Sequence, residues 1–178
     1  PVDYDPTAQA PTWDRFLNEI LPDANTRSFV QRAAGYSMFG TGDEHVLLVL
    51  HGSGANGKST LIEALRHVLG DYAMAAPAST FCDRHPGQPT NDLARLADAR
   101  AVFVGESSST ARLDVATVKA LCGGDQIAAR YLYAEYIEFV PAFTPWLATN
   151  HRPIVDDTDL AIWRRIRLVP FAITIPEE

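Results

Sequence analysis

The chain has 178 residues, 47% of them hydrophobic, which is enough to bury a full core without disulfides. Its formal net charge of −7 excludes a protein that coats nucleic acid with one broad basic face, although a few basic residues in a channel are compatible with it. Cys82 and Cys122 stand alone, without zinc or CxxC spacing, and are expected to be buried thiols in a reducing compartment. No apolar run has the length of a membrane span, so a soluble cytoplasmic protein is expected.

Residues 1–44 are predicted to form a linker and a helical lead-in. The first twelve residues are proline-rich, and the absence of an initiating Met indicates a piece of a longer polypeptide. Apolar residues at helical spacing predict one helix over 12–21, with Thr12 as its N-cap, and a second over 25–40 that ends near Gly40.

Residues 45–178 are predicted to form one α/β core. Continuous apolar runs are typical of parallel strands covered on both faces, and they occur at 45–52, 101–106 and 144–150. Helices are expected at 58–70, with Val68 on the buried stripe, and at 113–125, and a short helix that runs into a strand is expected within 160–171. This alternation predicts a parallel sheet with helices on both faces.

A glycine-rich run, "HGSGANGKST" at 51–60, follows the first apolar strand. It matches G-x-x-x-x-G-K-[ST] without a gap, and a helix follows it, which is the context of a phosphate-binding loop. The predicted ligand is ATP with Mg²⁺. The predicted nucleotide-binding residues are Gly52, Ser53, Gly54, Ala55, Asn56, Gly57, Lys58, Ser59 and Thr60.

Two residues of this loop have specific expected roles. Lys58 would reach the β- and γ-phosphates, and Ser59 would place its hydroxyl on Mg²⁺. Gly54 and Asn56 suit the positive φ angles that such a loop needs.

Hydrolysis needs an acid, a group that orients water, and positive charge on the γ-phosphate. Glu106 ends the strand at 101–106 and is expected to polarise water and to help hold the metal. Asn150 ends another strand and could hold the water and sense the phosphate. Arg164 and Arg165, in an apolar segment, are candidates for an arginine finger supplied to a neighbouring subunit.

Four segments together closely resemble the superfamily 3 helicase domain of phage and plasmid primases, related also to poxvirus primase-helicases. They are "GSGANGKST", "LARLADARAVFVGES", "LCGGDQIAARYLYAEYIEFVPAFTPWLATNHRP" and "AIWRRIRLVPF", and the likeness runs from about residue 11 to 173. The resemblance implies an AAA+-like P-loop fold with a β-hairpin insertion. It also implies a hexameric ring that moves along single-stranded or forked DNA, and a primase domain fused to it in the parent protein. The chain alone has no obvious collar domain, so a monomer is compatible with it.

Carried over by motif, the resemblance assigns residues 52–60 as the Walker A loop, Glu106 as the Walker B acid and Asn150 as sensor 1. It makes Arg165 the first choice for the finger and Arg164 the second. The sequence departs from the pattern at Gly105, where many relatives carry a second acid. The implied location is the cytoplasm of a bacterial host, encoded by a phage, prophage or plasmid.

The segment from Lys119 to Tyr136 would include a hairpin that grips DNA in the pore. Two strands around a turn near residues 134–135 fit that hairpin. The expected DNA-binding residues are Lys119, Arg130, Tyr133 and Tyr136, because phosphate charge and stacking faces suit single strands. The alternatives are that the tyrosines simply pack as strand residues and that Arg130 bonds to Asp125. The turn is acidic at Glu135.

Two other functions fit part of the pattern. A small-molecule kinase would use the P-loop without a partner's arginine, and the loop at 77–92, with Arg84 and His85, is a weak candidate for its lid. An ATP-binding module with weak hydrolysis would fit the missing acid at Gly105.

Overall fold

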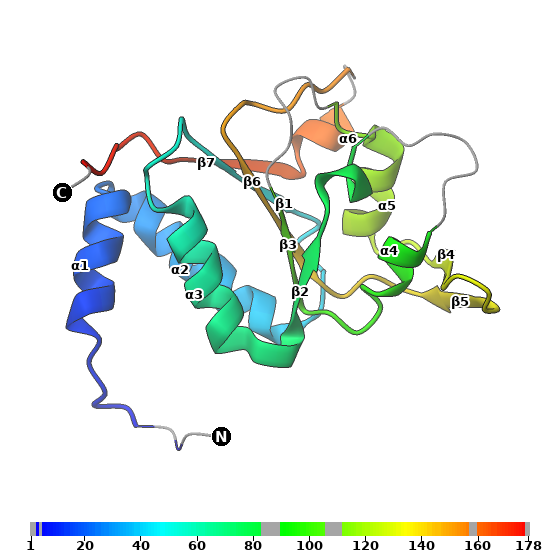
Figure 1. The fold of residues 1–178 in the computed structure, drawn as a ribbon, viewed down its shortest axis with the longest axis horizontal. Coiled ribbons are helices and arrows are strands. Elements are labelled where there is room, and N and C mark those ends of the chain that lie inside the picture. Colours follow the sequence, from blue (N-terminus) through cyan, green and yellow to red (C-terminus); the bar gives the residue numbers. More distant parts are fainter. Residues whose placement is uncertain (1–2, 4, 83–89, 106–111, 157–159, 177–178) are drawn as a thin grey trace.

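The computed structural model describes residues 3, 5–82, 90–105, 112–156 and 160–176. A single parallel sheet of five strands, in the order β2-β3-β6-β1-β7, forms its centre (Figure 1). The strands are β1 (Leu47–His51), β2 (Ala73–Ala76), β3 (Ala101–Val104), β6 (Thr144–Thr149) and β7 (Ile166–Pro170). The predicted parallel α/β architecture is confirmed.

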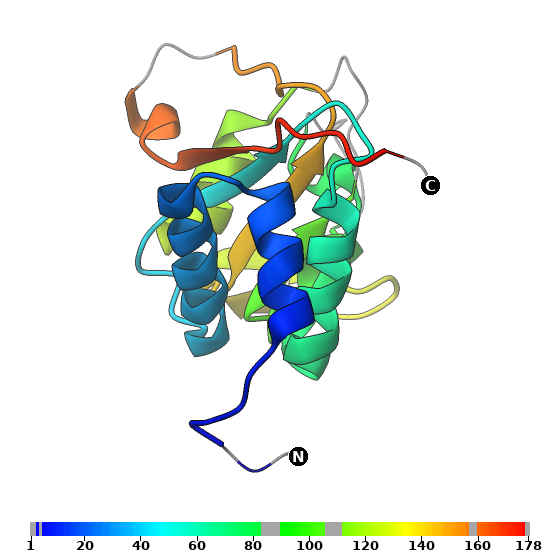
Figure 2. The same ribbon diagram turned by 90° about the vertical axis from the view of Figure 1, so that its left-hand side faces the viewer.

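Helices cover both faces of the sheet (Figures 1 and 2). On one face lie α1 (Pro11–Ile20), α2 (Ala24–Phe39) and α3 (Lys58–Leu69). On the other lie α4 (Asn91–Ala94), α5 (Val115–Gly123) and α6 (Leu160–Trp163). Short 3₁₀ turns, η1 (Gly70–Tyr72) and η2 (Ala78–Thr80), flank β2.

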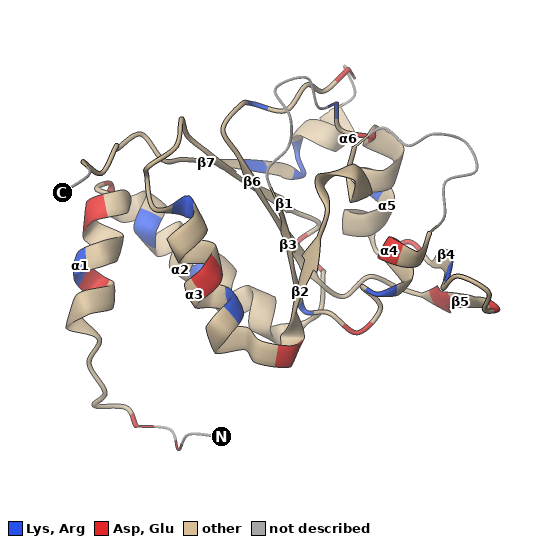
Figure 3. Ribbon diagram, in the orientation of Figure 1, with Lys and Arg blue, Asp and Glu red and all other residues tan. Residues whose placement is uncertain are grey.

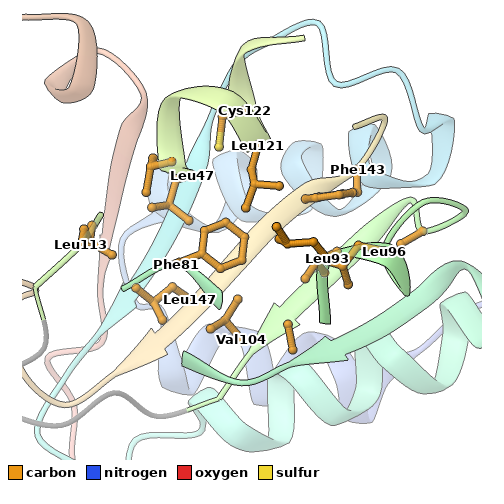
Figure 4. Packing of buried hydrophobic residues seen from close by; sticks show 14 of the residues in the cluster. Leu47, Phe81, Leu93, Leu96, Val104, Leu113, Leu121, Cys122, Phe143 and Leu147 are labelled. Carbon is orange, nitrogen blue, oxygen red and sulfur yellow. The ribbon is translucent and has the colours of Figure 1, made fainter. Parts of the chain in front are cut away.

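Alternate residues of β1 enter two separate hydrophobic clusters. Leu47 and Val49 pack with the face that carries α4, α5 and α6, while Leu48 and Leu50 pack with α1, α2 and α3. This follows from the two-residue period of a strand, and it explains why the segment is apolar throughout. Figure 4 shows the first cluster, where Phe81 lies among side chains from the sheet and α5.

Two local expectations were wrong. Thr12 is not an N-cap, because α1 already begins at Pro11, a residue favoured in the first turn, and Ala10 occupies the cap position. Val68 is 75% exposed rather than part of the buried stripe of α3. The start and end of α2 follow ordinary capping rules, since the Asp23 carboxylate accepts from Thr26 N–H at 2.7 Å and Gly40 ends the helix in the left-handed conformation.

The edge strand β2 has no counterpart among the predicted elements. Its sequence, Ala-Met-Ala-Ala, has little strand preference of its own. It forms because it pairs in register with β3, from Ala73 opposite Ala101 to Ala76 opposite Val104.

A separate antiparallel hairpin joins β4 (Ile127–Arg130) to β5 (Tyr136–Phe139) and projects from the α4 side of the molecule (Figure 1). Near its turn, the hairpin is bonded to the α4 region: Arg130 N–H donates to Thr90 Oγ1 at 3.1 Å, and the Tyr131 hydroxyl donates to Ala94 O at 3.2 Å. The predicted hairpin is confirmed. Within the described ranges, no helix is long and apolar enough to cross a membrane.

Candidate phosphate-binding site

The loop between β1 and α3 lies at the carboxyl edge of the sheet. Three of its residues are left-handed: Gly54 at φ 105°, Ala55 at φ 45° and Gly57 at φ 80°. The expectation of a positive φ was right for Gly54 and wrong for Asn56, since Ala55 takes that conformation instead. Left-handed residues in such a turn direct successive N–H groups toward one side, which makes a concave site for an anion.

Close packing explains why two positions of the loop must be glycine. A Cβ at Gly52 would lie 2.2 Å from the carbonyl oxygen of Phe171, and one at Gly57 would lie 2.4 Å from Ile20 Cγ2. The loop is therefore held between the segment after β7 and the end of α1.

Lys58 is a buried cation at the site. Its side chain is buried, and its Nζ donates to Gly52 O at 2.6 Å, Asn56 Oδ1 at 3.0 Å and Asn150 Oδ1 at 3.1 Å. These contacts fix the ammonium beside the first turn of α3, whose N-terminal end carries positive dipole charge. The bond to Asn150, at the end of β6, was not among the predicted contacts, and it brings two of the predicted site residues together.

A cleft of about 520 Å³ opens in front of this group. Seven consecutive residues of the predicted nucleotide site, from Gly54 to Thr60, line it, while Gly52 is buried behind them and Ser53 is exposed. The far wall comes from the ends of β3 and β6, at Gly105 and Asn150. The strand order causes this, because β6 lies between β1 and β3.

His51 precedes the loop and its pKa lies below the ordinary 6.5. Burial is the largest cause, followed by the positive charges of Arg152, Lys58 and His151. Lys58 and Arg66 both line the cleft, which favours an anionic ligand.

The predicted acid Glu106 lies outside the described residues, and so do Arg84 and His85 of the lid hypothesis. Gly105 lines the cleft and contributes no carboxylate there. Ser59 is exposed and lines the cleft, as a metal-holding hydroxyl must be. No group of three or more His, Cys, Asp or Glu residues that could hold a metal occurs in the part of the chain that the structure describes.

The two arginines after α6 differ in their surroundings. Arg165 is only 9% exposed, donates from Nη1 to Ala161 O at 2.7 Å, and has its Nη2 close to Gly123 at the end of α5. Arg164 is exposed. The order of preference made from the sequence stays a prediction, while this placement favours Arg164 as the residue with a side chain open to another subunit.

The predicted DNA-binding residues occupy two elements. Tyr133 is at the tip of the hairpin, fully exposed and left-handed, and Tyr136 is 64% exposed. The Arg130 guanidinium lies 5.2 Å from the centre of the Tyr136 ring, a cation–π contact in place of the suggested bond to Asp125. Lys119 is half-buried and belongs to α5 rather than to a hairpin strand.

Sequence reasoning missed the two other charged residues of the cleft. Glu63 and Arg66 line it from α3, and both are exposed. The signal was available, since they stand four and seven positions after Ser59 and so share its helix face.

Charged residues of both signs are otherwise scattered over the molecule, and β4 and β5 carry one sign each (Figure 3).

Solved structures show the same fold. An apo structure of the NrS-1 C-terminal region matches with a TM-score of 0.68 at 13% identity, covering 93% of this chain and 38% of that one. A second apo structure, of NrS-1 residues 305–718, matches with a TM-score of 0.66 at 12% identity, covering 96% and 39%.

Curated relatives come from large viruses. "Putative helicase L207/L206" of Acanthamoeba polyphaga mimivirus is 34% identical over 158 residues, covering 88% of this chain and 16% of the relative. "Putative helicase 022R" of Frog virus 3 (isolate Goorha) is 32% identical over 165 residues, covering 89% and 17%. "Putative primase C962R" of African swine fever virus (isolate Tick/Malawi/Lil 20-1/1983) is 27% identical over 171 residues, covering 92% and 18%.

The chain thus spans less than a fifth of the length of these three relatives. Residues 50–165, which include the phosphate loop, the hairpin and both arginines after α6, match one family over more than half of the chain. The chain belongs to DUF5906, a family of unknown function.

Proposed function

We propose that this chain is the ATP-driven motor module of a DNA helicase of the superfamily 3 type. The observation that carries the proposal is the buried Lys58 ammonium, held between the phosphate loop and Asn150 at the edge of an open cleft. The ordered sequence motifs that resemble superfamily 3, and the helicase and primase names of the viral relatives, support it.

The residues present fit a nucleoside triphosphate with Mg²⁺. The cleft volume of about 520 Å³ is in the range of small-molecule sites, roughly 300–1,000 Å³. The loop N–H groups and Lys58 would hold the phosphates, while Ser59 and Glu106 would hold the metal, which neutralises phosphate charge when bound. Asn150, already bonded to Lys58, would orient the attacking water, and Glu106 would accept its proton.

The arginine finger is assigned to Arg164, with Arg165 as the residue that positions it. The turn after α6 is fixed to its own subunit at Arg165, whose side chain is buried beside Gly123 and whose carbonyl oxygen accepts from Leu47 N–H at 2.8 Å. That attachment leaves Arg164 exposed at the surface, where it could complete the cleft of a neighbour in a hexameric ring. Such a finger contributes roughly 10³ to 10⁵ in rate.

The hairpin would contact single-stranded or forked DNA. Tyr133 and Tyr136 offer exposed rings for base stacking, and Arg130 supplies charge at the same place. The relatives named as helicases and primases are viral, so the module is proposed to serve viral DNA replication. Origin in a phage, prophage or plasmid, the cytoplasm as its location, and a fused primase domain remain predictions.

One observation favours a second candidate, an ATP-binding module with weak hydrolysis. Gly105 lines the cleft at the end of β3 without a carboxylate, so the next residue in the sequence, Glu106, would have to serve both metal and water. This candidate would bind the same nucleotide and the same DNA as the first, and would differ only in its rate of ATP hydrolysis.

ATPase measurements on the full-length protein test both candidates. For a helicase motor, the ATPase rate per subunit should increase when single-stranded DNA is added and when the protein concentration is raised. The Lys58→Ala variant should lack this activity. If the protein binds ATP but hydrolyses almost none of it, even with DNA present, the ATP-binding module with weak hydrolysis would be supported instead. Turnover that responds to neither DNA nor concentration would contradict both and favour a kinase.

A further inference from the structure

The segment after β7 runs across the outer side of the phosphate loop (Figures 1 and 2). Phe171 N–H donates to His51 O at 2.7 Å, and Ile175 N–H donates to Ala55 O at 2.7 Å. Neither Phe171 nor Ile175 lines the cleft. The segment therefore contacts the loop from outside the cleft that a ligand would fill.

The bond from Ile175 determines how one peptide unit of the loop is turned. The Ala55 carbonyl and the Asn56 N–H belong to the same planar trans peptide, so they point in opposite directions. An anion site needs N–H groups toward the ligand and carbonyl oxygens away from it. By holding the Ala55 carbonyl outward, the Ile175 N–H keeps the Asn56 N–H turned toward the cleft.

Ala55 has a conformation that needs such support. Its φ of 45° is left-handed, which is unfavourable for a residue with a Cβ. Conformations of this kind persist where the surrounding structure determines them. The attachments at His51 and Ala55 lie on both sides of Gly52 and Gly54, so they fix the loop at two points.

Two further hydrogen bonds link this segment to the Lys58 ammonium. The Phe171 carbonyl accepts from Asn56 Nδ2 at 3.4 Å, and Asn56 Oδ1 in turn accepts from Lys58 Nζ at 3.0 Å. The same carbonyl oxygen would clash with a Cβ at Gly52. Backbone groups of Phe171 thus orient the amide that holds Lys58.

We propose that Phe171 and Ile175 are positioning residues, which hold the phosphate loop in its anion-binding form through their backbone groups. The proposal rests on the proposed nucleotide binding. It predicts that ATP affinity depends on the Ile175 N–H and depends much less on the Ile175 side chain.

Substitution at Ile175 separates these two contributions. Ile175→Pro removes the N–H donor and keeps apolar bulk, whereas Ile175→Val keeps the donor. In the full-length protein, Ile175→Pro should weaken binding of a fluorescent ATP analogue by about tenfold, as expected for one lost hydrogen bond, and Ile175→Val by less than about twofold. The thermal unfolding midpoint of each variant without nucleotide checks that both are folded.

Each outcome distinguishes this proposal from the proposed function. Equal affinity in Ile175→Pro and the wild type, or equal loss in both variants, would overturn the positioning role while nucleotide binding stands. Failure of the wild type to bind the analogue would instead overturn the function. If Ile175→Pro does not fold, amide exchange of the wild type decides: slow exchange at Ile175 that slows further with ATP supports the proposal, and rapid exchange contradicts it.

Discussion

The side-chain oxygen of Asn150 accepts a hydrogen bond from Lys58 Nζ at 3.1 Å, which joins the end of β6 to the start of α3. The two residues are distant in sequence and come together because β6 pairs with β1 along its length. This bond places a neutral amide beside the charge that is proposed to hold the γ-phosphate.

Replacing Lys58 with Ala should weaken ATP binding by roughly 10- to 150-fold, because a hydrogen bond to a charged group contributes about 1.5–3 kcal/mol. Isothermal titration calorimetry measures this directly. Asn150→Ala is the matched variant: it removes a neutral partner and should lower ATP turnover much more than ATP affinity. Wild-type affinity in Lys58→Ala would contradict the site.

The phosphate loop and the strands that carry it could be predicted because their signals are local. The spacing of Gly52, Gly57 and Lys58 and the continuous apolar run of β1 both stand in one short stretch. Asn150 could be placed as well, since polar residues at the carboxyl ends of parallel strands meet at one edge.

Other features depend on contacts that no local pattern contains. Adjacent arginines look alike in sequence, and only the turn after α6 directs Arg165 inward toward Gly123 and leaves Arg164 exposed. The bond between Ile175 and Ala55 uses backbone atoms, so side-chain identities give no sign of it.

Subunits that carry Arg164→Ala, mixed with subunits that carry Lys58→Ala, should regain part of the ATPase activity that each lacks alone. Each mutant can complete a site for the other, because the loop and the finger come from different subunits. The measurement is the ATPase rate against the mixing ratio. Arg167→Ala, a nearby exposed arginine, should remain active by itself.

Arg165→Ala should behave differently from Arg164→Ala. It removes a buried side chain bonded to Ala161 O, and should lower the free energy of unfolding by about 0.5–3 kcal/mol. Urea unfolding of both variants compares them. A loss in Arg164→Ala as large as that in Arg165→Ala would contradict the assignment of the two arginines.

Tyr133→Ala should weaken single-stranded DNA binding by about 1–3 kcal/mol if its exposed ring stacks on a base. Arg130→Ala should weaken binding and lower the salt slope by about one if it contacts a phosphate. Fluorescence anisotropy across a salt series measures both. Tyr131→Phe is the control, because the Tyr131 hydroxyl bonds to Ala94 O within the chain and should not affect DNA affinity.

The two cysteines should react at different rates with iodoacetamide. Burial raises the pKa of Cys122 to about 12, so its thiolate is scarce at pH 8, and the side chain is also inaccessible. Cys82 is half-buried rather than fully buried as expected, and should be alkylated first. Mass spectrometry of the native protein over time follows both, and earlier modification of Cys122 would contradict the packing of α5.

Stability should fall as the pH drops below about 6.5, partly because of His51. Its pKa is lowered by burial and by the charges of Arg152, Lys58 and His151, so protonation is disfavoured in the folded state only. The resulting stability is fully present above the unfolded-state pKa and is lost as the pH falls toward the folded-state value.

Urea unfolding between pH 5.5 and 7.5, a window around the model-peptide His pKa of about 6.5, tests the contribution of His51. His51→Gln should lose less stability than the wild type over this range, because it has no imidazole to protonate. The same substitution at His67, which is exposed on α3, controls for the loss of an imidazole elsewhere. Identical pH slopes for the wild type and His51→Gln would show that the charges around the phosphate loop do not act on His51.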